Sequence, residues 1–273
     1  MHLSAMTVFP VKSLRGIETE SAWVEARGLH ADRRWLITNA QGDFLTQRTH
    51  PRMALVTTEL VSEGVRCTAP GIAAITIPYE PLAPTTLNVT VWQSTCQAHI
   101  VDATLDQWFS DYLGLACHLV YMPETTRRVV NPLYAAPGDI VSFADGYPVL
   151  LAGQSSLDDL NARMAEPLPM ARFRPNLVIS GTDAFAEDTW ARIRIGTVEF
   201  AVVKPCARCV MTTVDPARGE FAGKEPLRTL ATYRRDGDKV LFGQNAIPRG
   251  SGMVRVGDSV EVIAVREPQR GVQ

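Results

Sequence analysis

Two cysteines, Cys206 and Cys209, stand three positions apart in the stretch VVKPCARCVMTTVDPARGE. A thiolate is the reactive and metal-binding form of cysteine, and neighbouring positive charge favours it. Arg208 directly precedes Cys209, and Lys204 is close in sequence, so the pattern favours an ionised thiol at Cys209. The pair could be half of a zinc site, a redox couple, or a ligand for another group that binds a thiolate.

A closed zinc site needs four ligands, usually supplied as two pairs. The other cysteines form no second pair, and the histidines show no ligand spacing. These residues are Cys67, Cys96, Cys117, His2, His30, His50, His99 and His118. A thioredoxin-like pair belongs at a strand-to-helix junction, whereas the residues that follow this pair, VMTTV, are typical of a strand. Taken alone, the motif is most simply interpreted as two half-buried cysteines.

Cationic and polar side chains also stand at the ends of several expected strands. Guanidinium groups match phosphate oxygens in geometry, so such strand ends suit a phosphate and the polar edge of a heterocycle. The residues are Lys12, Ser13 and Arg15 in FPVKSLRG, Arg33 and Arg34 in HADRRW, and Arg172, Arg174 and Asn176 in ARFRPN. Each group alone is explained equally well by a solvated turn, but together they predict positive strand ends near one thiol.

The elements that must position these residues are mainly strands. Apolar runs of strand type return about every ten residues between turn residues, as in all-β domains, and residues 33–48 predict a hairpin. Helices are expected at 104–114, 155–164 and 225–235. We expect Thr104 to cap the first and Ser155, with Asp158 three residues later, to cap the second. Pro226 suits the first turn of the third.

The fold class is therefore predicted to be α+β, mostly β, with two β-rich domains. The polar, proline-containing stretch 122–139 is the best boundary. We expect a first domain at 1–122, a second, β-barrel-like domain with a few peripheral helices at 123–266, and a tail at 267–273. Because the cationic residues and the thiol come from both domains, we expect the site between them.

Composition limits the classes of function. The chain has 273 residues, 46% of them hydrophobic and 21% charged, with a net charge of −2. This balance is typical of a soluble globular protein and gives no reason to expect nucleic acid or an anionic membrane as a partner. No run of about 20 apolar residues predicts a spanning helix, and the first residues lack a secretion signal. Five scattered cysteines fit a reducing cytoplasm.

The ordered set of motifs resembles a known family. FPVKS, DRRW, FRPNLVISG, AEDTW, IGTVEF, CARCVMTTVDPARGE, EPLRTL and FGQN resemble the MOSC-domain proteins, and most closely the branch with the mitochondrial amidoxime reducing component and its bacterial relatives. The resemblance runs from about Val8 to Val262. FRPN and the C-x-R-C-x-x-T-T-V-D-P pattern are its most specific parts.

The resemblance implies an enzyme that carries a molybdenum cofactor, Mo-molybdopterin. Cys209 matches the family's metal ligand and is the implied catalytic residue, which suits a soft thiolate beside a sulfur-ligated metal. Cys206 is implied to have a structural role. The implied cofactor-binding residues are Lys12, Ser13, Arg33, Asp145, Gly146, Tyr147, Arg174, Asn176 and Arg208.

Three departures from the family pattern affect the expectations. Gly146 and Tyr147 stand where relatives can carry hydroxyl side chains, although backbone N–H groups can also bind phosphate. Asn245 stands where a relative has tyrosine, so the substrate side of the site is expected to differ. The chain contains no C-x4-C-x2-C ferredoxin motif, so we expect electrons from a separate ferredoxin-, flavodoxin- or cytochrome-type protein.

The resemblance predicts a cytoplasmic, monomeric, molybdenum-dependent oxidoreductase that reduces a small N-hydroxylated or related N-oxygenated compound. One alternative is a carrier of sulfur or of the molybdenum cofactor that uses the Cys209 thiolate. Another is a cofactor-free thiol redox protein that uses Cys206 and Cys209. Substituting each cysteine separately distinguishes these functions.

Overall fold

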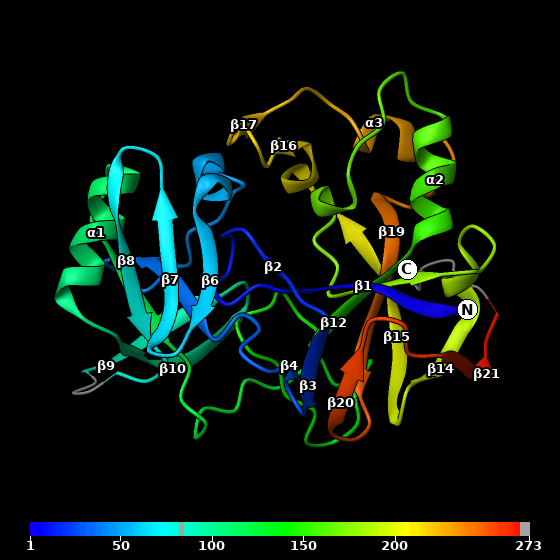
Figure 1. Ribbon diagram of the computed structural model, residues 1–273, viewed down its shortest axis with the longest axis horizontal. Helices are drawn as coiled ribbons and strands as arrows, with labels where there is room; N and C mark the ends of the chain where they lie inside the picture. The colour runs from blue at the N-terminus through cyan, green and yellow to red at the C-terminus, as the bar shows by residue number, and fades with distance from the viewer. Residues whose placement is uncertain (82–84, 268–273) are drawn as a thin grey trace.

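The computed structural model describes residues 1–81 and 85–267 and shows two β-rich lobes side by side (Figure 1). The first lobe is formed by residues 33–121. Its elements are β5 (Trp35–Asn39), a 3-10 turn (Pro51–Leu55), β6 (Thr57–Val61), β7 (Gly64–Ala69), β8 (Ile72–Pro78), β9 (Thr85–Val91), β10 (Ser94–Ile100), α1 (Ala103–Leu113) and β11 (Cys117–Tyr121). The strands form one sheet in the order β5-β11-β10-β9 and another in the order β6-β7-β8.

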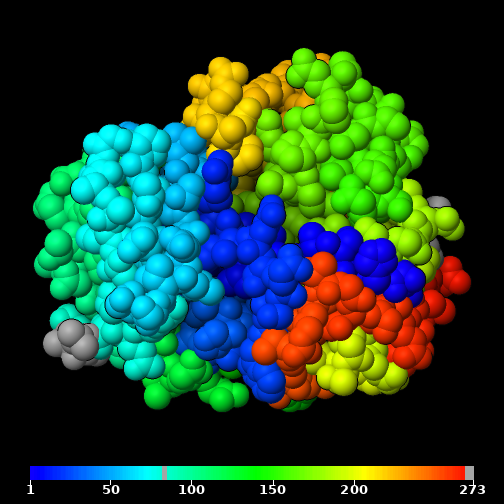
Figure 2. All heavy atoms as spheres, viewed as in Figure 1, coloured from blue at the N-terminus to red at the C-terminus, as the bar shows by residue number. Residues whose placement is uncertain are grey.

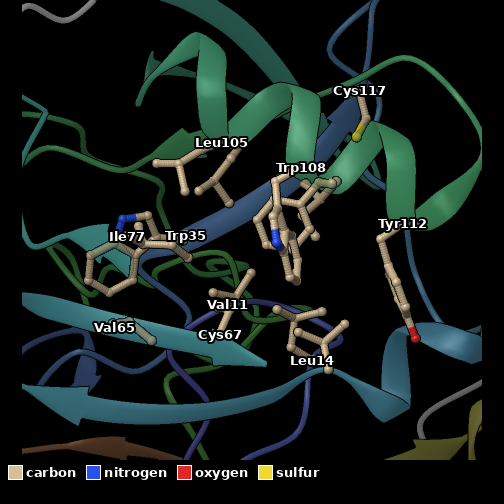
Figure 3. Close-up of a cluster of buried hydrophobic side chains, with 14 of the residues drawn as sticks. Val11, Leu14, Trp35, Val65, Cys67, Ile77, Leu105, Trp108, Tyr112 and Cys117 are labelled. Atoms are coloured by element: carbon tan, nitrogen blue, oxygen red, sulfur yellow. The ribbon is translucent and has the colours of Figure 1, made fainter. Parts of the chain in front are cut away.

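The core of the first lobe lies under α1, whose apolar side chains recur at helical spacing. Trp108 points from the helix into the cluster that contains Val11 and Cys67 (Figure 3). Tyr112 points from the same helix toward the 3-10 turn, where its hydroxyl donates to the carbonyl of Arg52 at 3.0 Å. Gly114 ends the helix in the left-handed conformation that glycine adopts without strain. The N-terminal cap differs from the expectation: Asp102 accepts a hydrogen bond from the backbone N–H of Thr104 at 2.7 Å, because Asp102 directly precedes the first helical residue, Ala103, and Thr104 lies inside the helix.

The second lobe combines the first residues of the chain with residues 149–265. Its elements are β1 (His2–Val8), β2 (Ile17–Glu18), β3 (Ser21–Glu25), β4 (Gly28–Leu29), β12 (Val149–Gly153), α2 (Gln154–Ala162), β13 (Leu177–Ser180), β14 (Trp190–Ile195), β15 (Val198–Arg208), β16 (Val214–Asp215), β17 (Glu220–Phe221), α3 (Leu227–Leu230), β18 (Arg235–Asp236), β19 (Lys239–Pro248), β20 (Gly252–Arg255) and β21 (Val260–Val265). Short 3-10 turns lie at Met170–Arg172, Ala186–Thr189 and Val210–Thr213.

A nine-stranded sheet organises the second lobe in the order β2-β1-β13-β12-β19-β15-β14-β21, with β18 beside β19. Only the β12–β13 pair in this sheet is parallel, and α2 supplies the crossover that a parallel pair requires. Strand β1 pairs antiparallel with β13, and β3 pairs with β20. The atoms at the start of the chain accordingly lie on the second lobe, and the blue atoms that follow them in the chain lie between the two lobes (Figure 2).

Three local expectations are corrected by the structure. Helix α2 begins at Gln154 after Gly153, and the Ser155 hydroxyl donates to the carbonyl of Thr182 instead of capping the helix. Helix α3 has one turn, because the chain enters the β18–β19 hairpin soon after it. The second half of the expected 33–48 hairpin forms only isolated bridges, since residues 43–44 divide their pairing between β5 and β9.

The structure confirms the α+β, mostly β fold with two β-rich parts and few helices. The domain limits 1–122 and 123–266 stay a prediction, although the pairing of β1 places His2–Val8 in the sheet of the second lobe. Apart from Glu267, the expected tail 267–273 lies outside the described residues. Within residues 1–81 and 85–267, no helix has the length and apolar character needed to cross a membrane.

Candidate functional site

A cavity of about 500 Å³ lies between the lobes, and we call it the thiol cavity. All ten residues that the family resemblance implied line it, whereas Arg15, Arg34 and Arg172, also expected at cationic strand ends, do not. The ten are Lys12, Ser13, Arg33, Asp145, Gly146, Tyr147, Arg174, Asn176, Arg208 and Cys209. They come from segments up to about 200 residues apart in the chain, so the fold gathers them in one place; their roles toward a cofactor stay a prediction.

Backbone hydrogen bonds beyond the end of β1 align three segments of the cavity wall. The N–H of Arg33 donates to the carbonyl of Phe9 at 2.7 Å, and the N–H of Phe143 donates to the carbonyl of Arg33 at 2.9 Å. The N–H of Lys12 donates to the carbonyl of Trp35 at 2.9 Å. These contacts fix Lys12 and Arg33 beside the loop that carries Asp145.

Arg128 holds that loop from behind. Its buried guanidinium donates to the carbonyls of Ser142 and Ala144, at 2.8 and 2.6 Å, and to the carbonyl of Asp145 at 3.0 Å. One side chain thus binds three of the loop's carbonyl oxygens. Gly146 follows, and a Cβ added there would meet no atom within 4 Å, so the loop is open toward the cavity at this residue.

Cys209 directly follows β15 and precedes a 3-10 turn, where the hydroxyl of Thr212 donates to the carbonyl of Cys209 at 3.0 Å. The cation that contacts its sulfur is Arg48, whose Nε donates to Cys209 Sγ at 3.3 Å. Arg208, which the sequence placed beside this thiol, instead donates to Cys206 Sγ at 3.0 Å and to the carbonyl of Phe173 at 2.6 Å. Alternation along the extended strand explains the difference, because Arg208 and Cys206 share one face of it.

Asp145 forms ion pairs with two cations of the cavity. Its carboxylate accepts from Lys12 Nζ at 2.5 Å and from Arg48 at 2.8 Å. Burial alone would raise the pKa of Asp145, but the charges and hydrogen bonds of Lys12 and Arg48 outweigh it and hold this pKa well below its usual range. Burial lowers the pKa of Lys12 to about 8, against the opposing effect of Asp145.

Asn176 orients Arg33 and has no hydrogen-bonding capacity left for a ligand. Its side-chain nitrogen donates to Thr7 O and Asp32 Oδ1, and its side-chain oxygen accepts from Arg33 and from the N–H of Leu150. An amide group offers two donors and about two acceptor sites, so all of them are used. In this structure Asn176 therefore positions the guanidinium that lines the cavity.

Arg174, in contrast to Asn176, has hydrogen-bond donors left for a ligand. Its guanidinium lies 4.2 Å from the ring centre of Phe9, and its side chain makes no hydrogen bond to any residue in 1–81 or 85–267. Burial, together with the charge of Arg33, lowers the pKa of Arg174 to about 9. The buried hydroxyl of Ser13 likewise has no partner among the described residues. Both groups are available to an anion such as phosphate.

Backbone strain is concentrated at this cavity. Six non-glycine residues in the described part of the chain have positive φ, and four of them line the cavity: Ser13 at 68°, Arg33 at 49°, Trp92 at 58° and Arg174 at 55°. Such conformations are costly for residues with a Cβ and cluster at functional sites. The strain is independent of the charges and indicates the same site.

Sequence reasoning missed Arg48 and Trp92. The Arg48 guanidinium lies 4.7 Å from the ring centre of Trp92, and Trp92 Nε1 donates to Asp145 at 3.2 Å. Arg48 falls in a segment that we expected to be a strand, so its side-chain direction was not predictable. Asn245, noted only as a departure from the family, lines the cavity and donates to the carbonyls of Lys204 and Pro205.

The comparisons with known proteins agree with this arrangement. The MOSC N-terminal beta barrel domain matches residues 1–116, and the MOSC domain matches residues 138–261. Mitochondrial amidoxime-reducing component 1 of Homo sapiens is 32% identical over 96% of this chain and 82% of its own length. Mitochondrial amidoxime reducing component 2 of Rattus norvegicus is 34% identical over 94% of this chain and 82% of its own length.

Two MOSC-type domains over most of its length define this chain as a MOSC protein. It belongs to the family of the amidoxime-reducing components, a family of reductases by the names of these relatives.

The residues of the thiol cavity fit a molybdenum cofactor. No cluster of three His, Cys, Asp or Glu side chains in the described part of the chain could hold a metal ion by itself, so a metal here would need ligands from a cofactor. The cavity offers the thiols of Cys206 and Cys209, together with the Arg174 guanidinium and the Ser13 hydroxyl, neither of which has a hydrogen-bond partner among residues 1–81 and 85–267. A soft sulfur donor beside groups that bind an oxyanion matches a phosphate-bearing, sulfur-ligated metal.

Proposed function

We propose that this protein is a molybdenum-cofactor-dependent reductase of small N-hydroxylated or related N-oxygenated compounds, with electrons supplied by a separate donor protein. The observation that carries the proposal is the Cys209 sulfur in a cation-lined cavity between two MOSC-type domains. Family membership supports the reaction class, because curated relatives are named for amidoxime reduction.

Each group in the cavity has a defined part in this function. Cys209 would supply the protein's sulfur ligand, while Arg174, Lys12 and Ser13 would bind the phosphate and pterin edges. When bound, the cofactor supplies the two-electron redox chemistry that removes an oxygen atom from nitrogen. Arg48 donates to Cys209 Sγ and also to Asp145, so it joins that sulfur to the ion pair of Asp145 with Lys12.

We place the substrate side of the cavity at Trp92 and Asn245. Trp92 is half exposed, and its ring packs on Phe44 at 5.2 Å between ring centres. Asn245 is smaller than the tyrosine expected from the family, so we propose that this side accepts a bulkier N-oxygenated substrate. A reducing cytoplasm is the proposed location, and all five cysteines are free thiols.

Two single substitutions test the function. Cys209→Ser is expected to lose both molybdenum, measured by elemental analysis, and reduction of benzamidoxime with a chemical electron donor. Cys206→Ser is the matched control, since its thiol contacts Arg208 and not Arg48; it is expected to keep the metal and most of the activity. Wild-type protein saturated with cofactor but inert toward amidoximes and hydroxylamines would refute the reductase.

The same proteins distinguish the alternatives. A mass increase of one sulfur atom on Cys209, without molybdenum, would indicate a sulfur carrier. Equal loss of activity in both variants would indicate a dithiol couple. Each result is obtained by mass mapping of the two cysteine peptides alongside the metal analysis.

A further inference from the structure

A second cavity of about 360 Å³ lies next to the thiol cavity, on the other side of Arg174. Both lobes contribute to it. Its lining includes Phe9 after β1, Gln47 and Ala54 from the first lobe, and Met170 from the second. Arg174 and Met211 line both cavities and thus form a common wall. The volume is within the range of small-molecule sites.

The second cavity carries an excess of positive charge. Arg15, Arg172 and Arg174 line it, against the single carboxylate of Glu18. One Arg15 nitrogen is already used, because it donates to the carbonyl of Pro216 at 2.6 Å. Arg172 and Arg174 are the cations that a ligand could engage.

Arg172 is the least satisfied of these cations. Only 7% of it is exposed, and neither its Nε nor its Nη1 has a hydrogen-bond partner in residues 1–81 and 85–267. The nearest acid, Asp215, lies 3.6 Å from Nη2, which is too long for a hydrogen bond. Burial lowers the pKa of Arg172, against the opposing charge of Asp215. A buried cation without acceptors is costly, and an anion in the cavity would offset that cost.

The remaining lining is largely apolar. It includes Phe9, Met170, Val178, Met211 and Val214. A bare inorganic ion would leave this surface unused, whereas an aliphatic or aromatic body would bury it. The methionines adapt to ligands of different shape. The lining therefore selects an organic anion with a small apolar body.

We propose that the second cavity binds a small organic carboxylate, with its carboxylate at Arg172 and its hydrocarbon body along the apolar wall. This site is separate from the cofactor function of the thiol cavity. Since Arg174 and Met211 belong to both cavities, a bound carboxylate also contacts the wall of the thiol cavity.

Hexanoate is the probe, and hexan-1-ol, with the same chain and no charge, is its control. Isothermal titration of the wild-type protein is expected to show saturable hexanoate binding and at least about tenfold weaker binding of hexan-1-ol. Arg172→Met is expected to weaken hexanoate binding by about tenfold or more, as for loss of a charge-assisted contact.

Two further variants locate the site. Ala171→Trp keeps every charge and places bulk at an exposed residue that lines the second cavity; it is expected to weaken hexanoate binding even if Arg172→Met is poorly folded. Lys204→Met changes only the thiol cavity and is expected to leave binding unchanged. The proposal is overturned by absence of saturable binding, by equal binding of the alcohol, or by weakening in Lys204→Met but not in Ala171→Trp.

Discussion

Arg48→Met tests whether Arg48 is the cation that contacts the Cys209 sulfur in the thiol cavity. Methionine keeps an unbranched apolar side chain and removes the guanidinium whose Nε donates to Cys209 Sγ at 3.3 Å. Arg48 is mostly buried, with 16% of its side chain exposed, so solvent screens the contact only partly. Burial opposes its charge, but Asp145 and Cys209 together raise the pKa of Arg48.

The magnitude follows from the type of contact. A hydrogen bond to a charged group contributes about 1.5–3 kcal/mol. Since alkylation requires negative charge on the reacting sulfur, loss of that contact is expected to slow alkylation of Cys209 near neutral pH by at most about 10- to 150-fold. In Arg48→Met, Asp145 also loses one of the two cations that pair with it. Its less neutralised negative charge is expected to slow alkylation of the nearby sulfur further.

The assay is the rate of iodoacetamide alkylation at Cys209, followed by mass spectrometry with fragment ions that separate it from Cys206. Arg208→Met is the control, because Arg208 contacts the other thiol, and it is expected to change the Cys209 rate less than twofold. A slower rate in Arg208→Met with no change in Arg48→Met would refute the assignment.

Three other substitutions give separate expectations. Lys12 loses its proton as pH rises through about 8, so sulfate binding measured calorimetrically should weaken from pH 7 to pH 9. Lys12→Met should remove this pH dependence, and an unchanged dependence in the variant would contradict the role of Lys12. Arg174→Ala should weaken cofactor retention on gel filtration by about 10- to 150-fold, and unchanged retention would place Arg174 away from the cofactor. Glu187→Ala leaves the hydroxyl of Ser156 and the N–H of Gly153 without their acceptor. It should lower the free energy of unfolding, measured by thermal denaturation, by about 1–3 kcal/mol, and Glu187→Gln should lower it less.

The residues of the site were predictable where a motif carried them. Lys12, Arg174 and Cys209 stand in ordered motifs, and the structure brings all three to one cavity. Contacts between lobes were not predictable, because no sequence period shows that Arg48 reaches a thiol 161 residues further along the chain. Arg208, which directly precedes Cys209, was wrongly expected to contact the Cys209 thiol. Neighbouring residues along a strand point to opposite faces, so adjacency in sequence does not place their side chains together.

The fold shows the same division. Apolar periodicity gave the strands and the first helix, since it reflects which side chains must be buried. Helix limits were less predictable: Asp102, not Thr104, caps α1, and α3 is a single turn. The place of β1 in the sheet of the second lobe depends on its pairing with Ile179 and its neighbours. The apolar pattern of β1 itself does not indicate which distant strand it pairs with.

The pairing of β1 with β13 also has a consequence for biosynthesis. His2 lies opposite Ser180 in the sheet, so the strand made first waits until nearly two thirds of the polypeptide has left the ribosome before its partner exists. Residues 33–121 can bury most of the first lobe's core during that interval, while β1 has only its short pairing with β2, at Thr7 and Val8. A fusion partner attached at Met1 would therefore be held beside an unfinished sheet edge during translation, and tags at this end are expected to reduce the yield of folded protein more than tags at the other.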